Sequence, residues 1–343
     1  MQFETENANR SRRETKITDY IMYKSFIMFL SMLFLAEAAG AAGTDAAATP
    51  AKRTYLYSVK GTDSLYLDHY VSSSAEGRRP CMIFVFGGGF VGGTRDNAEY
   101  LPYFEFMTQK GYDVVSIDYR LGLKPLRGVE RKISAREMVG LFNNAVSIAV
   151  EDLFSATLFV LDNADEWMID TDMIVTCGSS AGAITVLQAE NAVCNHTAAS
   201  AVLPAGFNYA GVISFAGAIF SVDGAPKWER EPSPVMFFHG NADNQVPFEK
   251  ASLLGVGFYG SKFIFGQFEK HDWPCWFYTL DYQDHAMAVT PMDANRGEIS
   301  IFLDDFVRDR RRMTVKTEVR SDEFPPRNTK FKVMDYVKAN YSE

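Results

Sequence analysis

Apolar residues are concentrated in short, dense runs that recur along most of this chain. Runs of this kind predict strands buried on both faces of a sheet, and they cover residues 81–86, 112–117, 173–177, 211–216, 234–238 and 276–280. Two earlier segments, 55–59 and 65–71, alternate partly between apolar and polar residues, as a half-buried antiparallel edge does. This order predicts an antiparallel opening followed by a parallel sheet.

Helical spacing of apolar residues separates these strands. It is found in five segments, at residues 100–109, 134–167, 181–190, 247–255 and 294–307. Ser134 is a suitable N-cap for the longest of them, which is either one helix or two helices joined by a kink. Strands that alternate with helices predict an α/β fold, with helices on both faces of a mostly parallel central sheet.

The first residues have the pattern of an export signal. Lys24 precedes the apolar run 25–36, and small residues at 36–39 form an A-x-A-like cleavage site. The run is too short to span a bilayer comfortably. We therefore expect a secreted or periplasmic protein with no stable membrane insertion after the signal is cleaved. The polar residues 1–21 lie ahead of this signal, which makes Met22 a candidate for the true start.

These patterns divide the 343-residue chain into four parts. They are an N-terminal extension with a signal peptide at 1–38, a linker at 39–53, one α/β domain at 54–309 and a polar C-terminal tail at 310–343. With 47% hydrophobic residues, the chain can build a large core, which excludes global disorder. The tail is expected to pack loosely or to wrap around the domain.

Charge and cysteine content exclude several classes of partner. The formal net charge is −9, whereas a general affinity for nucleic acid or for an anionic membrane needs a basic face. Export permits disulfides, and Cys194 and Cys275 lie near enough to loops to pair, but connectivity cannot be read from sequence. Cys81 and Cys177 lie in predicted buried strands. The chain has no C-x-x-C pair, so neither a zinc site nor a redox site has support, and no cofactor is expected.

The strongest chemical signal is the G-x-S-x-G motif at residues 178–182. It stands between a predicted strand and a predicted helix, which is the setting in which such a motif exposes a nucleophilic serine. The two glycines allow a tight turn around Ser180, and the following helix directs the N–H of Ala181 toward the same point. The alternative is an ordinary turn between a strand and a helix.

A second glycine motif follows the strand at 81–86. Gly87, Gly88 and Gly89 carry no Cβ, so their backbone N–H groups can approach a bound oxyanion closely. Three glycines also make a flexible turn, which is the alternative explanation. The position of the loop, directly after a strand and ahead of the serine motif, favours an oxyanion-binding role.

A serine nucleophile needs a histidine base and a carboxylate that orients it. His285 follows the last predicted strand, Asp243 follows the strand at 234–238, and the chain order Ser180, Asp243, His285 is the one expected for this arrangement. Asp284 is a competing orienter, but adjacent residues rarely point the same way. We expect His239 to hold its turn by a hydrogen bond.

The remaining histidines and two further carboxylates receive structural explanations. His69, His196 and His271 are expected to face solvent. Asp118 and Asp152 are expected to tie loops near the site by salt bridges. The aromatic residues Trp228, Phe265, Trp273 and Trp276 can stack on a sugar or phenol ring, although core packing is the commoner use of such residues.

Taken together, these residues resemble the hormone-sensitive-lipase-like and carboxylesterase branch of the α/β-hydrolases, over about residues 55–307. The matching segments are Gly87-Gly88-Gly89-Phe90, Asp118-Tyr119-Arg120, 178–182, 239–247 and His285. The resemblance implies backbone N–H donors at Gly88, Gly89 and Ala181 for the oxyanion. The family usually opens its glycine loop with histidine, and here Phe86 must hold the loop by packing instead.

The resemblance implies a serine carboxylic-ester hydrolase that acts through an acyl-enzyme, on small-molecule or carbohydrate esters. The chain looks similar to secreted bacterial esterases that remove acyl groups from plant polysaccharides. One alternative is a serine peptidase of the prolyl-oligopeptidase type, although the chain ahead of residue 55 is too short for the extra domain of those enzymes. Another is a non-catalytic binding protein on the same fold. The walls of the substrate pocket are expected to come from loops such as 121–133, 221–233 and 257–275. The oligomeric state is left open.

Overall fold

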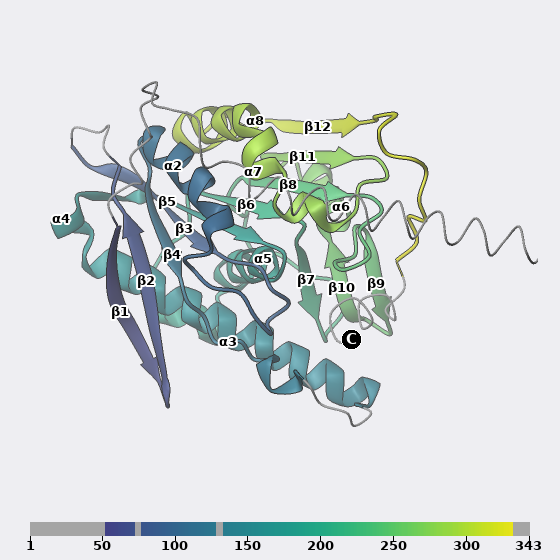
Figure 1. Cartoon of the computed structure of the whole chain (residues 1–343), viewed down its shortest axis with the longest axis horizontal. Coiled ribbons are helices and arrows are strands. Elements are labelled where there is room, and N and C mark those ends of the chain that lie inside the picture. The colour runs from purple at the N-terminus through teal and green to yellow at the C-terminus, as the bar shows by residue number, and fades with distance from the viewer. Residues whose placement is uncertain (1–51, 73–76, 128–132, 332–343) are drawn as a thin grey trace, which may run out of the picture. The chain divides into compact units, whose positions relative to one another are not determined.

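A nine-stranded sheet forms the centre of the computed structural model, which describes residues 52–72, 77–127 and 133–331 (Figure 1). Its strand order is β1-β2-β4-β3-β5-β6-β8-β11-β12. The strands are β1 (Lys52–Lys60), β2 (Asp63–Tyr70), β3 (Arg79–Val85), β4 (Asp113–Ile117), β5 (Ile169–Ser179), β6 (Gly211–Phe215), β8 (Val235–Gly240), β11 (Cys275–Leu280) and β12 (Thr314–Val319).

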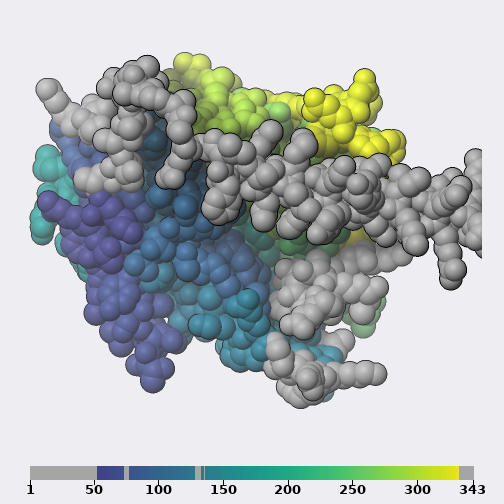
Figure 2. Space-filling model, viewed as in Figure 1, coloured from purple at the N-terminus to yellow at the C-terminus, as the bar shows by residue number. Residues whose placement is uncertain are grey.

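The pairing of these strands confirms the predicted α/β architecture. β1 pairs antiparallel with β2, and β2 pairs antiparallel with β4, whereas every pair from β4 through β3 to β12 is parallel. Every residue of β4, β6 and β8 is buried, as their continuous apolar runs require. The N-terminal strands and β12 therefore form opposite edges of the sheet, and they lie on opposite sides of the space-filling view (Figure 2).

Helices cover both faces of the sheet. They are α2 (Leu101–Gln109), α3 (Ala135–Asp162), α4 (Ala164–Trp167), α5 (Ala181–Cys194), α6 (Ser261–Lys270), α7 (Pro291–Ala294), α8 (Arg296–Ile301) and the π-helical segment Phe302–Arg308. Short 3₁₀ turns occur at Ala98–Tyr100, Lys124–Leu126, Ala198–Val202 and His285–Ala288. Phe215 of β6 contacts Tyr103 of α2. The preceding residue, Ser214, faces α5 instead, because a Cβ added at Gly217 would meet both Ser214 and Ala183 of α5. Since neighbouring residues of a strand face opposite sides, α2 and α5 cover opposite faces.

The segment expected to hold one helix or two contains two. Ser134 caps α3, because its Oγ accepts a hydrogen bond of 3.2 Å from the N–H of Glu137, and the helix breaks at Asn163 before α4. By length and composition, residues 136–162 of α3 could cross a membrane, but 56% of the most apolar window is buried. Helix α3 packs on α5, so it is a helix of the protein core. The predicted export signal lies outside the described residues.

Two predictions for residues 247–275 are wrong. Residues 247–255 were expected to be helical, but they contain β9 (Lys250–Leu253), which pairs antiparallel with β10 (Val256–Gly260). Together with β7 (Ala218–Ser221) these strands form a separate three-stranded sheet. Helix α6 then occupies a segment expected to be a loop. The buried face of this helix includes Ile264, Phe265 and Phe268.

The polar tail contributes a strand to the main sheet. Residues 314–319 form β12, which pairs along its whole length with β11. Its residues alternate between exposed and half-buried, as the solvated edge of a sheet does. The α/β domain was expected to end at residue 309, whereas in the structure the sheet continues to Val319. A strand with so few apolar residues is recognisable only from its partner.

Buried polar residues account for two further outcomes. All four cysteines are buried and free, so Cys194 and Cys275 are not joined. His69 was expected to face solvent, but the residue is only 2% exposed. Its Nε2 lies 2.7 Å from Asp113 Oδ2, and this partner explains how a polar ring is accommodated there. The prediction for His69 is therefore wrong.

Candidate active site

Ser180 stands on a strained turn between β5 and α5. Its backbone has φ 50° and ψ −113°, a conformation that non-glycine residues rarely adopt and that concentrates at functional sites. A Cβ at Gly178 would collide with the carbonyl of Gly182, and a Cβ at Gly182 would collide with the carbonyl of Val85 in β3. Both glycines of the motif are therefore required by space, because the turn is pressed against its own helix and the neighbouring strand.

Hydrogen bonds fix this turn on both sides. The N–H of Ser180 donates to the carbonyl of Phe215 at the end of β6, at 2.9 Å. The neighbouring Ser179 donates from Oγ to the carbonyl of Ala288, also at 2.9 Å, which ties the turn to the segment that carries His285. Sequence reasoning missed this role of Ser179, for which the motif contains no signal.

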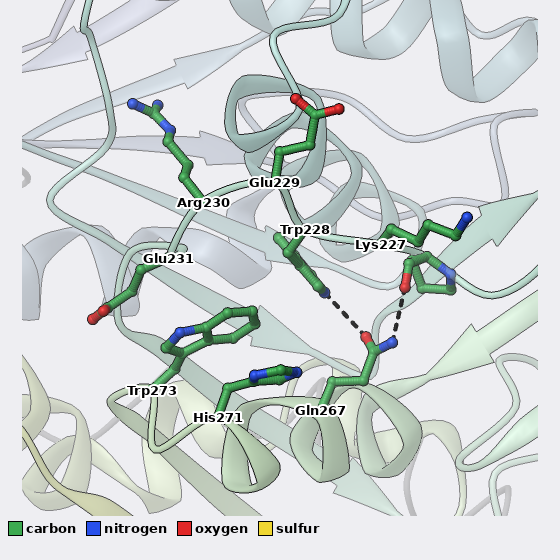
Figure 3. Close-up of a pocket in the computed structure, with 9 residues that line it drawn as sticks. Lys227, Trp228, Glu229, Arg230, Glu231, Gln267, His271 and Trp273 are labelled. Atoms are coloured by element: carbon green, nitrogen blue, oxygen red, sulfur yellow. Dashed lines mark hydrogen bonds between the residues drawn. The ribbon is translucent and has the colours of Figure 1, made fainter.

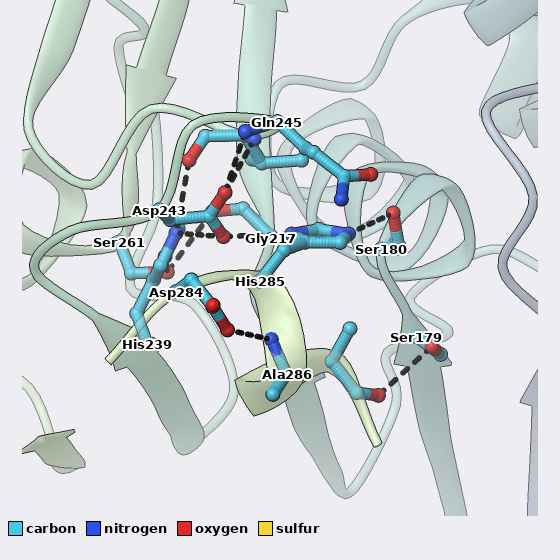
Figure 4. Close-up of polar contacts among 12 residues, drawn as sticks. Ser179, Ser180, Gly217, His239, Asp243, Gln245, Ser261, Asp284, His285 and Ala286 are labelled. Atoms are coloured by element: carbon cyan, nitrogen blue, oxygen red, sulfur yellow. Dashed lines mark hydrogen bonds and ion pairs between the residues drawn. The ribbon is translucent and has the colours of Figure 1, made fainter. Parts of the chain in front are cut away.

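Ser180, His285 and Asp243 form one chain of hydrogen bonds (Figure 4). His285 Nε2 lies 2.8 Å from Ser180 Oγ, and His285 Nδ1 lies 2.7 Å from Asp243 Oδ2. The three residues follow β5, β11 and β8 in the sheet, at the carboxyl ends of parallel strands, where ligands bind in open α/β sheets. The structure thus brings together the three residues singled out as nucleophile, base and orienter.

Asp243 is held as a carboxylate in a buried place. Its side chain is fully buried, and Oδ1 accepts backbone hydrogen bonds from Gln245 at 2.8 Å and Val246 at 2.9 Å. Burial by itself raises the pKa of this carboxyl group, but the adjacent His285 and His239 outweigh that effect and hold the pKa of Asp243 well below its usual range. The carboxylate is therefore ionised wherever His285 can act as a base.

Asp284 points away from His285. Its Oδ1 accepts from the N–H of Ala286 at 3.0 Å (Figure 4). Its Oδ2 pairs with Arg327 Nη1 at 2.6 Å. The side chain is 43% exposed. Of the two candidate orienters, only Asp243 contacts the imidazole.

The glycine loop packs directly against the serine turn. A Cβ added at Gly87 would lie 3.3 Å from Ser180 Cβ, and Gly88 has φ +127°, where a side chain would also strike the carbonyl of Gly92. Within the described part of the chain, the N–H groups of Gly88, Gly89 and Ala181 have no hydrogen-bond acceptor. These three donors are therefore free for a ligand at this edge of the sheet.

Aromatic residues hold the glycine loop where the family usually has histidine. The ring of Phe86 packs on Tyr119 with 4.5 Å between centroids, and Tyr119 Oη donates to the carbonyl of Phe86 at 3.0 Å. The hydroxyl of Tyr100 accepts from the N–H of Gly87 at 3.3 Å. The expected packing by Phe86 is present, while Tyr100 is an anchor that the sequence analysis missed. No local pattern marks Tyr100, since it acts across the chain on the loop.

Two more carboxylates form the salt bridges expected of them. Asp118 pairs with Arg95 Nη1 at 2.7 Å, and Asp152 pairs with Arg120 Nη2 at 2.8 Å. Asp152 Oδ2 also accepts from the N–H of Arg120, at 2.7 Å. These contacts tie the segment after β4 to the loop that follows β3 and to α3. Among the described residues, no group of three or more His, Cys, Asp or Glu side chains is arranged to hold a metal ion.

A hollow of about 460 Å³ lies near the amino ends of β8 and β11, whereas Ser180 follows the carboxyl end of β5 (Figure 3). It is lined by residues that precede β8 and β11, including Trp228 and Trp273. Trp228 Nε1 donates to Gln267 Oε1 at 3.0 Å, and one face of Trp273 is stacked on His271 at 4.6 Å. Of the four aromatics considered for sugar stacking, Phe265 and Trp276 are buried in the core. None of the four lies beside Ser180 in the structure.

Comparison with known proteins identifies similar esterases. A family model described as BD-FAE matches residues 67–125, which include the glycine loop. Fumonisin B1 esterase of Sphingopyxis macrogoltabida is 32% identical over 124 residues, which cover 35% of this chain and 22% of that protein. Gut esterase 1 of Caenorhabditis briggsae is 31% identical over 131 residues, which cover 38% of this chain and 22% of that protein. The chain thus matches less than a quarter of the length of these curated relatives.

Solved structures match over a larger share of the chain. Esterase 2 of Thermogutta terrifontis, phosphoramylated by tabun, has a TM-score of 0.55 and 22% sequence identity, and the match covers 76% of this chain and 95% of that one. The same esterase with bound propionate has a TM-score of 0.54 and 21% identity. Likeness at this identity shows a shared fold. The sheet order and the strained serine turn agree with this likeness, which shows the α/β-hydrolase fold.

Proposed function

We propose that the protein hydrolyses carboxylic esters, with Ser180 as the nucleophile, His285 as the general base and Asp243 as the residue that orients His285. The unbroken chain of hydrogen bonds from Ser180 Oγ through the imidazole to Asp243 carries this proposal. The strained turn under Ser180 and the esterases among the relatives support it. No cofactor takes part in the proposed reaction.

Each step follows from this geometry. His285 Nε2 takes the proton of Ser180 Oγ as that oxygen attacks the ester carbonyl, while Asp243 stabilises the imidazolium through Nδ1. The N–H groups of Gly88, Gly89 and Ala181 are the proposed donors to the oxyanion. His285 then gives its proton to the departing alcohol. Water, deprotonated by His285, then attacks the acyl-enzyme and releases the acid, while His285 returns the proton to Ser180 Oγ.

We further propose that the substrates carry short acyl groups on a small alcohol or a carbohydrate. Structures of the Thermogutta terrifontis esterase are described with bound propionate and with bound butyrate, which supports small acyl groups for a chain of this fold. The carbohydrate part rests on the resemblance to secreted esterases. Export, which rests on the apolar run 25–36, is also a proposal.

The test is covalent labelling combined with turnover. The mature protein and its Ser180→Ala variant are treated with a fluorophosphonate probe, and hydrolysis of p-nitrophenyl acetate is followed on both. Ser147→Ala, an exposed position on α3, serves as the matched control. Labelling and turnover should be lost in Ser180→Ala only, with turnover reduced by a factor of roughly 10⁴ or more.

Other outcomes would favour the alternative functions. Hydrolysis of aminoacyl amides without hydrolysis of acetyl esters would indicate a peptidase. A folded wild type that neither reacts with the probe nor turns over either substrate would refute the proposal and favour a binding protein.

A further inference from the structure

His239 lies directly behind the pair formed by Asp243 and His285. It is the penultimate residue of β8 and is 0% exposed. Its Nε2 lies 3.3 Å from Asp243 Oδ2 and 3.2 Å from the carbonyl oxygen of Val246. Its Nδ1 lies 2.8 Å from Ser261 Oγ at the start of α6 (Figure 4).

The neighbours of His239 determine where its ring carries a proton. Both groups within reach of Nε2 are acceptors, since one is a backbone carbonyl and the other is the ionised carboxylate of Asp243. A lone pair on Nε2 would face two oxygens, so Nε2 must carry hydrogen. The one hydroxyl proton of Ser261 can go to Nδ1 of a neutral ring or to the carbonyl of Gly217, which lies 3.0 Å from Oγ. In the second case Oγ accepts from Nδ1, and the ring is charged. The assignment of a proton to Nε2 therefore holds for the neutral and the charged ring alike.

With a proton on His239 Nε2, four N–H donors surround the carboxylate of Asp243. Oδ1 receives the backbone N–H groups of Gln245 and Val246, and Oδ2 receives the N–H groups of both histidines. A carboxylate torsion is broad and has little intrinsic preference, so its plane is set by such contacts. A donor on the far side of Oδ2 keeps that oxygen turned toward His285. It also withdraws electron density that would otherwise strengthen the pairing with the His285 imidazolium.

We infer that His239 is a second positioning residue of this site, one that donates from Nε2 to Asp243 and thereby sets both the orientation of the carboxylate and the basicity of His285. This inference rests on the proposed function. The charged neighbours do not compete for the role, because Asp284 pairs with Arg327 and its carboxylate faces away from His285. Phe248, whose ring meets His239 edge-on at 5.6 Å, brings no charge.

The test compares two variants at this position. His239→Leu keeps an apolar volume and removes the donor, whereas His239→Gln places an amide N–H near the position of Nε2. The matched control is His271→Leu, which replaces an exposed histidine at the C-terminal end of α6. The titration of His285 is followed by NMR on histidine-labelled protein, with His285→Gln to assign its signals. The pH profile of kcat/KM is measured alongside, and thermal unfolding shows that each variant is folded.

We expect the acidic limb of kcat/KM to move to higher pH in His239→Leu by roughly half a pH unit or more, because Asp243 loses a donor and holds the imidazolium more strongly. The NMR signals of His285 should follow this movement, and kcat should fall about 10- to 100-fold. His239→Gln should restore most of kcat and the position of the limb, while His271→Leu should match the wild type.

Two results would overturn the inference. One is a folded His239→Leu variant in which the titration of His285 and kcat both equal those of the wild type. The other is an equal loss of activity in the Leu and Gln variants with no movement of the His285 titration, which would show that His239 only fills space. If the wild type hydrolyses no ester, the proposed function fails, and the NMR titration still decides whether His239 acts on the pair.

Discussion

Two His–Asp pairs in the described part of the protein have the same N···O distance and very different surroundings. His285 lies 2.7 Å from Asp243, and His69 lies 2.7 Å from Asp113. The first pair is at the carboxyl ends of the parallel strands. The second is at the amino ends of these strands, because Asp113 is the first residue of β4. Distance between the imidazole and the carboxylate is therefore the same in the proposed catalytic pair and in the other pair.

The difference lies in what each imidazole meets next. His285 presents Nε2 to Ser180 and keeps 13% of its side chain exposed. His69 uses Nε2 to contact Asp113, stacks on Trp167 at 4.3 Å and keeps only 3% of its side chain exposed. The same carboxylate also receives two bonds from Arg79, at 2.7 and 3.1 Å. The imidazole of His285 joins a carboxylate to the hydroxyl of Ser180, whereas the imidazole of His69 is enclosed with Asp113 and Arg79.

The largest effect should follow from Asp243→Asn. This isosteric change leaves the shape of the site intact but offers His285 an amide, which favours the wrong tautomer for accepting the proton of Ser180. We expect kcat for p-nitrophenyl acetate to fall by roughly 10⁴ with little change in folded structure. Steady-state kinetics and circular dichroism measure the two quantities. Wild-type kcat in this variant would remove Asp243 from the mechanism.

Asp113→Asn should have the opposite signature. Burial raises the pKa of Asp113, but hydrogen bonds from His69 and Arg79 outweigh it and lower that pKa, which shows that the folded state favours the ionised form. Removing the charge leaves Arg79 and His69 without their partner. We expect the free energy of unfolding at pH 7 to fall by about 3 kcal/mol, measured by urea denaturation, with kcat per folded molecule unchanged. A loss of kcat in folded protein would mean that the enclosed pair communicates with Ser180.

The smallest effect is expected for Asp284→Ala, next to the base in sequence. Its exposed pair with Arg327 contributes little, so the free energy of unfolding should change by less than about 0.5 kcal/mol. Activity should stay within about twofold, because Asp284 does not touch His285. Parallel kinetics with Asp243→Asn decide which carboxylate orients the imidazole. A fall comparable to that of Asp243→Asn would reverse the assignment.

Sequence alone singled out the pair of His285 and Asp243 and misjudged the enclosed pair of His69 and Asp113. Ser180, Asp243 and His285 each follow a strand with a clear apolar pattern, and parallel strands carry such residues to the same end of the sheet. His69 has no comparable marker, because it lies within β2, whose burial does not alternate at this end. The proton that His239 directs at Asp243 was equally invisible, because it depends on which atoms face the ring.

The same limit explains the errors between residues 247 and 275. Helical spacing at 247–255 was local, but the segment contains β9, which pairs with β10, and β10 in turn pairs with β7. The buried face of α6 was present in the sequence as Ile264, Phe265 and Phe268, and an apolar count over that segment would have found the helix. The strand of the polar tail, in contrast, exists only through its pairing with β11.

That last strand bears on how the protein can be handled in the laboratory. β11 reads Cys-Trp-Phe-Tyr-Thr-Leu, and β12 satisfies the backbone groups along its outer side. A recombinant form shortened at residue 309 would present this aromatic strand as an open edge, which is the kind of surface that recruits further chains into aggregates. The charged residues of β12, among them Lys316 and Glu318, thus act as the solubilising border of the sheet.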